Sequence, residues 1–118
     1  MKINKELENS IIEWHIATFP DATLDSQIAK IEEEVDEVLN AENCQEFYKE
    51  LSDCWIVALA LQRWSLSAFR FAVIGLDYLE KERNWEIPQE SFEKMVEEKL
   101  EINKKRIWKK INNVYHHV

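Results

Sequence analysis

The sequence predicts an all-α fold, a helical bundle of about four to five helices in which residues 1–118 form a single domain. Three features of the chain support this prediction. Its 118 residues are enough for one hydrophobic core. Only one glycine and two prolines are present, so the turn residues that a β-fold needs are almost absent. Apolar residues make up 46% of the chain and recur at helical spacing, and we expect no sheet.

The first predicted helix covers residues 4–18. Leu7, Ile11 and Trp14 lie on one stripe at helical spacing. Pro20 follows shortly after this stripe and is a stop signal. One face of this helix is therefore expected to pack on the core.

The second predicted helix covers residues 24–41. Thr23 is a suitable N-cap, and Asp25 in the first turn interacts favourably with the helix dipole. At about 100° per residue, one face of this helix is apolar. This face consists of Leu24, Ile28, Ile31, Val35, Val38 and Leu39.

The third helix is expected to start at Cys44 or Gln45, to run through Leu61 and to form the centre of the bundle. Its segment CWIVALALQRW is apolar nearly all the way round, which is typical of a buried helix. The apolar run is too short to span a bilayer. Residues 67–83 and 89–112 predict two further helices, after which the tail is expected to fray.

Two pairs of acidic residues occur at helical spacing, Glu34 with Glu37 and Glu50 with Asp53. Residues three apart lie on the same face of a helix, so two antiparallel helices would bring four carboxylates together. Buried carboxylates without a partner are costly, and a divalent cation is the simplest reason for them to converge. Mg²⁺ prefers such oxygen ligands. The alternative is that these glutamates, as good helix formers, belong to a solvated surface.

The helical face separates the candidate ligands from the other acids of the same run. Glu34 borders the apolar stripe and Glu37 lies just outside it, whereas Glu32 and Asp36 fall on the far side. We therefore expect only the first two to take part in a metal site.

Candidate substrate-binding residues occur on two of the predicted helices. Lys99, Asn103 and Arg106 align along one edge of the helix over residues 89–112, and such a row suits phosphate binding. The alternative for basic residues near a helix C-terminus is interaction with the helix dipole. Gln27 precedes the first acidic pair by two turns on the same face, where its amide would reach a substrate or remain solvated.

Aromatic residues near the end of the first helix are candidates for contact with a nucleobase. Trp14 and Phe19 offer the kind of ring on which a purine stacks, although core packing is the commoner role. His15 lies between them and is expected at a helix end or against the base.

The acidic run resembles the EExxE…ExxD signature of the MazG-like, all-α nucleoside triphosphate pyrophosphohydrolases. The matching positions are Glu33, Glu34, Glu37, Glu50 and Asp53. The flanking segments WHIATFPDATLDSQIAKIEEE and KLEINKKRIW resemble a phage and bacterial branch described as dATP/dGTP diphosphohydrolases.

The resemblance implies an enzyme that hydrolyses a nucleoside triphosphate to the monophosphate and pyrophosphate, with a deoxypurine preference and a role in nucleotide-pool control. Its cofactor would be Mg²⁺, with Mn²⁺ as a possible substitute. The metal ligands would be Glu34, Glu37, Glu50 and Asp53, and Glu33 would position the attacking water.

The net charge of −8 argues against binding of a nucleic-acid polymer, which requires a basic surface. Cys44 and Cys54 have no zinc-site spacing, and no signal peptide is recognisable, so we expect a cytoplasmic protein. The chain has more apolar side chains than one small bundle can bury, which predicts a homodimer or homotetramer.

Two other functions compete with this interpretation. Carboxylate-bridged di-iron bundles use Glu-x-x-His pairs, and none of His15, His116 and His117 lies three residues after a glutamate. A non-catalytic helical interaction protein would keep its acidic face solvated and bind a partner through exposed aromatic residues.

Overall fold

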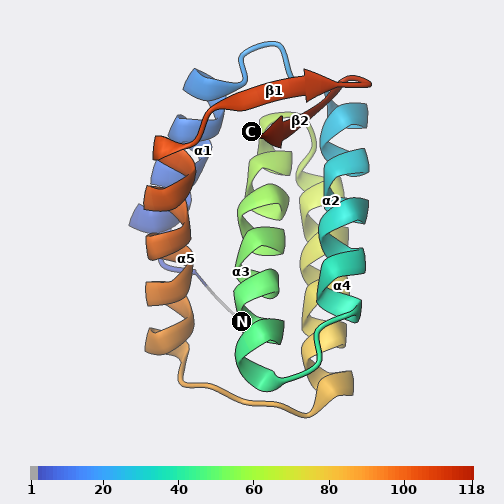
Figure 1. Ribbon diagram of the computed structural model, residues 1–118, viewed down its shortest axis with the longest axis vertical. Coiled ribbons are helices and arrows are strands. Elements are labelled where there is room, and N and C mark those ends of the chain that lie inside the picture. Colours follow the sequence, from blue (N-terminus) through green and yellow to red (C-terminus); the bar gives the residue numbers. More distant parts are fainter. Residues whose placement is uncertain (1–2) are drawn as a thin grey trace.

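The computed structural model describes residues 3–118 and confirms the all-α helical bundle (Figure 1). A short two-stranded sheet follows the helices. The elements in chain order are α1 (Lys5–Thr18), α2 (Leu24–Leu39), α3 (Cys44–Ala60), a 3-10 turn (Leu61–Arg63), α4 (Leu66–Arg83), α5 (Gln89–Lys105), β1 (Trp108–Ile111) and β2 (Val114–His117).

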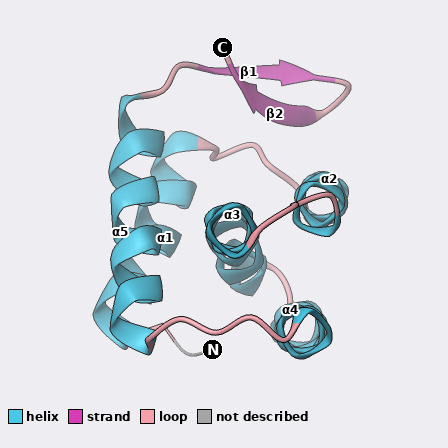
Figure 2. Ribbon diagram, turned by 60° about the horizontal axis from the view of Figure 1, so that its bottom comes forward, coloured by secondary structure: helices cyan, strands magenta, loops and turns pink. Residues whose placement is uncertain are grey.

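Helix α3 is the centre of the bundle, as its apolar sequence predicts. It contacts α1, α2, α4 and α5, which surround it in Figure 2. Phe47, Leu51, Cys54 and Ala58 of this helix have no exposed surface. Packing against four other helices therefore fixes the position of α3 and of the side chains that it carries.

The helix starts follow local capping rules. Thr23 and Ser26 form a capping box at the start of α2, and Asn43 accepts a hydrogen bond from the backbone of Glu46 at the start of α3. Helices α2 and α3 are joined by only a few residues and lie side by side (Figure 1).

The buried face of α2 is rotated from the predicted stripe. Ile28 and Leu39 are 37% and 49% exposed, whereas Ser26, Gln27 and Val38 are buried. The prediction was wrong at Ile28 and Leu39. The polar Ser26 and Gln27 are buried because their side chains have hydrogen-bond partners within the protein.

The predicted extent of the last helix was wrong, and so was the expectation of no sheet. Helix α5 ends at Lys105, and the following residues form an antiparallel hairpin in which Ile111 pairs with Val114. Asn112 and Asn113 both have positive φ, the conformation of a two-residue hairpin turn that asparagine tolerates. The tail is therefore a structured element that lies over one end of the bundle (Figure 2).

Helix α4 contributes one face to the core and leaves another exposed. Leu76 is buried and Val73 packs against the core, but Phe71, Ile74 and Tyr78 are 77%, 66% and 60% exposed. Within residues 3–118, none of the helices combines the length and apolar character that crossing a membrane would require.

Candidate metal centre

The four predicted ligands come together between α2 and α3. Each of Glu34, Glu37, Glu50 and Asp53 offers a carboxylate oxygen, and these oxygens lie within 4.8 Å of one another. Each helix supplies one pair at a spacing of three residues, so neighbouring turns of two packed helices face the same point. Glu33 lies outside this group, and Glu32 and Asp36 are exposed and do not line the cleft.

Burial, together with neighbouring charges, raises the pKa of Glu34, Glu50 and Asp53. Burial, followed by the charge of Asp53, raises the pKa of Glu34 to about 7. Burial and a hydrogen bond with Glu37 raise the pKa of Glu50 to about 7. Burial also raises the pKa of Asp53, although the nearby Lys99 acts in the opposite direction. Burial in the cluster therefore favours the protonated form of these carboxyl groups.

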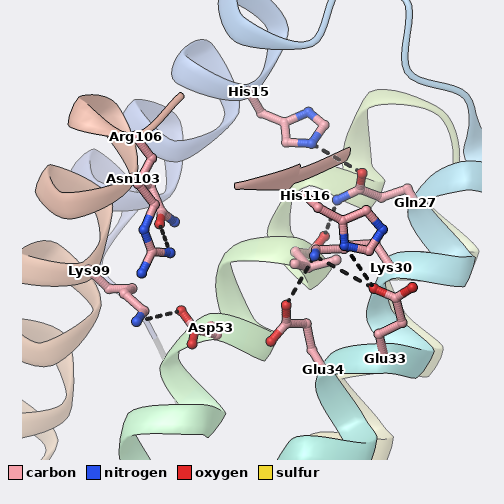
Figure 3. Close-up of polar contacts among 11 residues, drawn as sticks. His15, Gln27, Lys30, Glu33, Glu34, Asp53, Lys99, Asn103, Arg106 and His116 are labelled. Atoms are coloured by element: carbon pink, nitrogen blue, oxygen red, sulfur yellow. Dashed lines mark hydrogen bonds and ion pairs between the residues drawn. The ribbon is translucent and has the colours of Figure 1, made fainter. Parts of the chain in front are cut away.

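Two lysines contact the cluster from opposite sides (Figure 3). The Nζ atom of Lys99 on α5 lies 3.3 Å from an oxygen of Asp53. The Nζ atom of Lys30 on α2 lies 3.5 Å from Glu34 and 3.7 Å from Glu33. The candidate centre is thus a group of carboxylates bordered by ammonium groups.

The donor set fits a hard divalent cation. All the candidate ligands are carboxylate oxygens, the type that Mg²⁺ and Mn²⁺ prefer. Glu34, Glu50 and Asp53 are half-buried and Glu37 is exposed, so the cluster is accessible to solvent. Among the described residues, no histidine joins this group, which does not match a di-iron centre with Glu-x-x-His ligands.

The carboxylates line one part of a cleft with a volume of about 360 Å³. This volume is in the range of about 300–1,000 Å³ that is typical of small-molecule sites. The other end of the cleft is aromatic and lies under the hairpin. Its walls include Trp14, Phe19, Trp108 and Tyr115, whose rings contact one another at centroid distances of 4.5–6.1 Å.

Gln27 lines the cleft as predicted, but most of its amide is used inside the protein. Its Nε2 donates to the carbonyl oxygen of Val57 at 3.1 Å, and its Oε1 lies 3.1 Å from Nε2 of His15. Arg63 donates to Nδ1 of His15 at 2.7 Å. Arginine has only hydrogen-bond donors, so Nδ1 of His15 must accept from Arg63. The ring proton is therefore on Nε2, which donates a hydrogen bond to Oε1 of Gln27.

His15 is therefore a buried and neutral member of this chain of hydrogen bonds. Burial and the charge of Arg63 lower its pKa to about 4. The chain of bonds holds the Gln27 amide in one orientation at the cleft surface.

The residues of the predicted basic row line the wall of the cleft that is formed by α5 and the residue that follows it. Lys99, Asn103 and Arg106 all lie there, and Arg106 donates to the side-chain oxygen of Asn103 at 3.0 Å. Arg106 follows the last residue of α5, so its position is set by the helix end.

Part of the cleft lining was not predicted from the sequence. Lys30 was not selected, although it precedes Glu34 by four residues and so shares its face. Trp108, Tyr115 and His116 reach the cleft from the hairpin. The paired asparagines Asn112 and Asn113 were the signal for that hairpin.

The raised pKa values predict how stability depends on pH when EDTA removes divalent cations. Between the ordinary pKa of 4.5 and about 7, the folded state holds more protons on Glu34 than the unfolded state does. The contribution of Glu34 to the free energy of unfolding should therefore fall as the pH rises through this window and level off above it, whereas His15, whose pKa is lowered from 6.5 to about 4, contributes with the opposite sign over part of the window. We expect a loss on the order of 2 kcal/mol, since one pKa unit corresponds to about 1.4 kcal/mol and the coupled Glu50 adds little after screening.

Urea denaturation between pH 5 and pH 8 checks this expectation. The Glu34→Gln variant is the matched control, because His15 still titrates in it and Glu34 does not, so the parent should lose stability relative to this variant as the pH rises. If the free energy of unfolding of the parent does not fall relative to that of the variant across this window, the electrostatic description of the cluster is contradicted.

No protein-family model, curated protein or solved structure matches this chain.

Proposed function

We propose that the protein is a Mg²⁺-dependent nucleoside triphosphate pyrophosphohydrolase that releases the monophosphate and pyrophosphate. The observation that carries this proposal is the convergence of four carboxylates from two helices in the same cleft as a basic row. A polyanionic substrate needs both, because cations neutralise its phosphates and lysine or arginine side chains bind the oxygens that remain. The resemblance to the MazG-like signature supports the same reaction.

The side chains of the cleft have different roles in the proposed reaction. Bound Mg²⁺ would polarise the phosphate oxygens and lower the pKa of the attacking water. Glu34, Glu37, Glu50 and Asp53 hold the cation in this proposal, and Glu33 at the edge of the cluster orients the water.

Lys99 and Arg106 bind the phosphates that leave as pyrophosphate. Both line the wall of the cleft that faces the acidic helices. Asn103 is hydrogen-bonded to Arg106 and keeps the guanidinium directed along that wall. Its remaining amide group serves the sugar or a phosphate.

The aromatic end of the cleft binds the nucleoside. With the phosphates at the carboxylates, the base extends toward Trp14, Phe19, Trp108 and Tyr115. These rings offer apolar surface for a planar base. The preference for deoxypurine triphosphates, and a role in nucleotide-pool control, follow from the resemblance to the dATP/dGTP diphosphohydrolase branch. We place the reaction in the cytoplasm, where the free thiols of Cys44 and Cys54 stay reduced.

A panel of canonical and oxidised nucleoside triphosphates tests this proposal. Each is incubated with Mg²⁺ or with EDTA, and the products are identified by chromatography. We expect monophosphate and pyrophosphate with Mg²⁺ only. Diphosphate and orthophosphate as products, or equal rates in EDTA, would contradict the proposed reaction.

We also propose that two or four copies of the chain associate through the exposed face of α4. Phe71, Ile74 and Tyr78 project from this face, and Gly75 beside them has no neighbouring atoms that an added Cβ would meet. A second helix can therefore approach closely and remove these apolar side chains from water.

Light scattering at micromolar concentration checks this prediction. The parent should have the mass of a dimer or tetramer, and Phe71→Ser should shift it toward the monomer. Ile107→Ser is the matched control, because Ile107 is 74% exposed but lies outside α4. A monomeric parent would exclude this interface.

A further inference from the structure

Lys30 is a half-buried lysine whose ammonium group lies inside the candidate site. Its side chain is 19% exposed, against 76% for Lys5 and 42% for Lys104, which also form ion pairs along their own helices. Its Nζ lies 3.5 Å from Glu34 and 3.7 Å from Glu33, and the residue lines the cleft. Its ion pairs are thus part of the cleft wall, not of the outer surface.

The contacts of Lys30 have a counterpart across the cluster. Lys99, which is 11% exposed, lies 3.3 Å from Asp53. The two lysines thus contact Glu34 and Asp53, one member of each acidic pair, from α2 and α5. The other two members, Glu37 and Glu50, share a hydrogen bond with each other.

A divalent cation and Lys30 compete for the same oxygens. A cation held by the four carboxylates would lie a few ångströms from the Lys30 ammonium and repel it. Lysine carries its charge on a flexible four-carbon stem with three rotatable donors, so the group can move without a backbone change. The phosphates of the proposed substrate would be the nearest acceptors in the cleft.

We propose that Lys30 is a substrate-binding residue that exchanges partners: its ammonium group leaves Glu33 and Glu34 when the cation binds and then binds a phosphate of the substrate. This inference rests on the proposed function. It adds to the basic row on α5 a phosphate-binding residue on the opposite wall, and this residue belongs to the same helix as the first acidic pair.

The exchange predicts two effects of opposite sign for Lys30→Met. Without the competing ammonium, the variant should bind Mg²⁺ alone about tenfold more tightly than the parent. It should also bind inorganic pyrophosphate at saturating Mg²⁺ about tenfold more weakly, because a charge-assisted hydrogen bond is lost. If Lys30 only held Glu34 in place as a ligand, its removal would weaken Mg²⁺ binding and leave pyrophosphate binding unchanged.

Isothermal titration calorimetry with Mg²⁺, and then with pyrophosphate, measures both affinities. Lys30→Arg keeps the charge and should retain most of the pyrophosphate affinity. Lys104→Met is the matched control, since it removes a lysine that is paired with Glu101 outside the cleft. Thermal unfolding of each variant shows that it is folded.

The two titrations separate the failure of this inference from that of the proposed function. Tighter Mg²⁺ binding together with weaker pyrophosphate binding supports the exchange. A parent that binds both ligands, combined with a Lys30→Met variant that is equal to it or weaker for Mg²⁺, overturns the exchange alone. A parent that binds no Mg²⁺ overturns the proposed function and the exchange with it.

Discussion

Replacing Glu37 by glutamine is expected to reduce the rate of triphosphate hydrolysis by at least about 100-fold and to raise the Mg²⁺ concentration that is required. The Glu37 carboxylate belongs to the cluster of four, and a neutral amide is a much weaker ligand for a hard cation. Stabilisation by a metal is worth several kcal/mol, and each ~1.4 kcal/mol corresponds to a tenfold change in rate. Steady-state kinetics at increasing Mg²⁺ concentrations measures both effects.

Glu32→Gln is the control, because it removes the same charge from the same helix five residues earlier. Glu32 is exposed and lies outside the cleft, so its replacement should be nearly neutral. In EDTA, Glu37→Gln should be as stable as the parent or more so, since it relieves crowding among carboxylates, whereas Mg²⁺ should stabilise the parent alone. Equal activities and equal responses to Mg²⁺ for the Glu37→Gln and Glu32→Gln variants would mean that the acidic run is an ordinary solvated surface.

Removing Arg106 or Lys99 is expected to have the next largest effect, a loss in kcat/KM of about 10- to 100-fold for each alanine variant. Both side chains line the cleft, and hydrogen bonds to charged groups contribute about 1.5–3 kcal/mol each. Lys99→Ala also leaves Asp53 without the ion pair at 3.3 Å. Its pH profile should therefore shift more than that of Arg106→Ala, because Lys99 lowers the pKa of Asp53 through both its charge and a hydrogen bond, whereas Arg106 acts through its charge alone.

Lys104→Ala is the control for both variants, because this exposed lysine is paired with Glu101 on another face of α5. Its kcat/KM should be close to that of the parent. Similar losses for all three variants would mean that the net charge of the chain, and not the cleft wall, governs substrate binding.

Much of the acidic cluster was predictable because it depends on local rules. The spacing of Glu34 with Glu37 and of Glu50 with Asp53 places each pair on one helical face. The apolar sequence after Asp53 requires a buried helix, so the second pair has to lie at the core boundary. The structure brings these four carboxylates together within 4.8 Å.

The remainder of the cleft depends on tertiary contacts that helical periodicity does not contain. The hydrophobic pattern continued through Ile107 and Ile111, yet both side chains are exposed, because the chain turns at Asn112 and Asn113 into a hairpin. Lys110 and Tyr115 then bind Asp21 in the loop after α1. Such a contact between residues far apart in the sequence has no local signature.

The buried polar residues of α2 illustrate the same limit. Gln27 is buried because His15 and the carbonyl group of Val57 satisfy its amide, and hydrophobic periodicity favoured Ile28 instead. A polar residue enters the interior when partners from other elements are in place, and sequence alone does not reveal those partners.

An anomalous difference map from a crystal soaked in Mn²⁺ tests the central claim most directly. Mn²⁺ has the same preference for oxygen ligands as Mg²⁺ and scatters anomalously. We expect a peak between α2 and α3, within about 2.5 Å of carboxylate oxygens of Glu34, Glu37, Glu50 and Asp53. A map that has no peak among these four carboxylates at millimolar Mn²⁺, or that places the ion elsewhere on the chain, would contradict it.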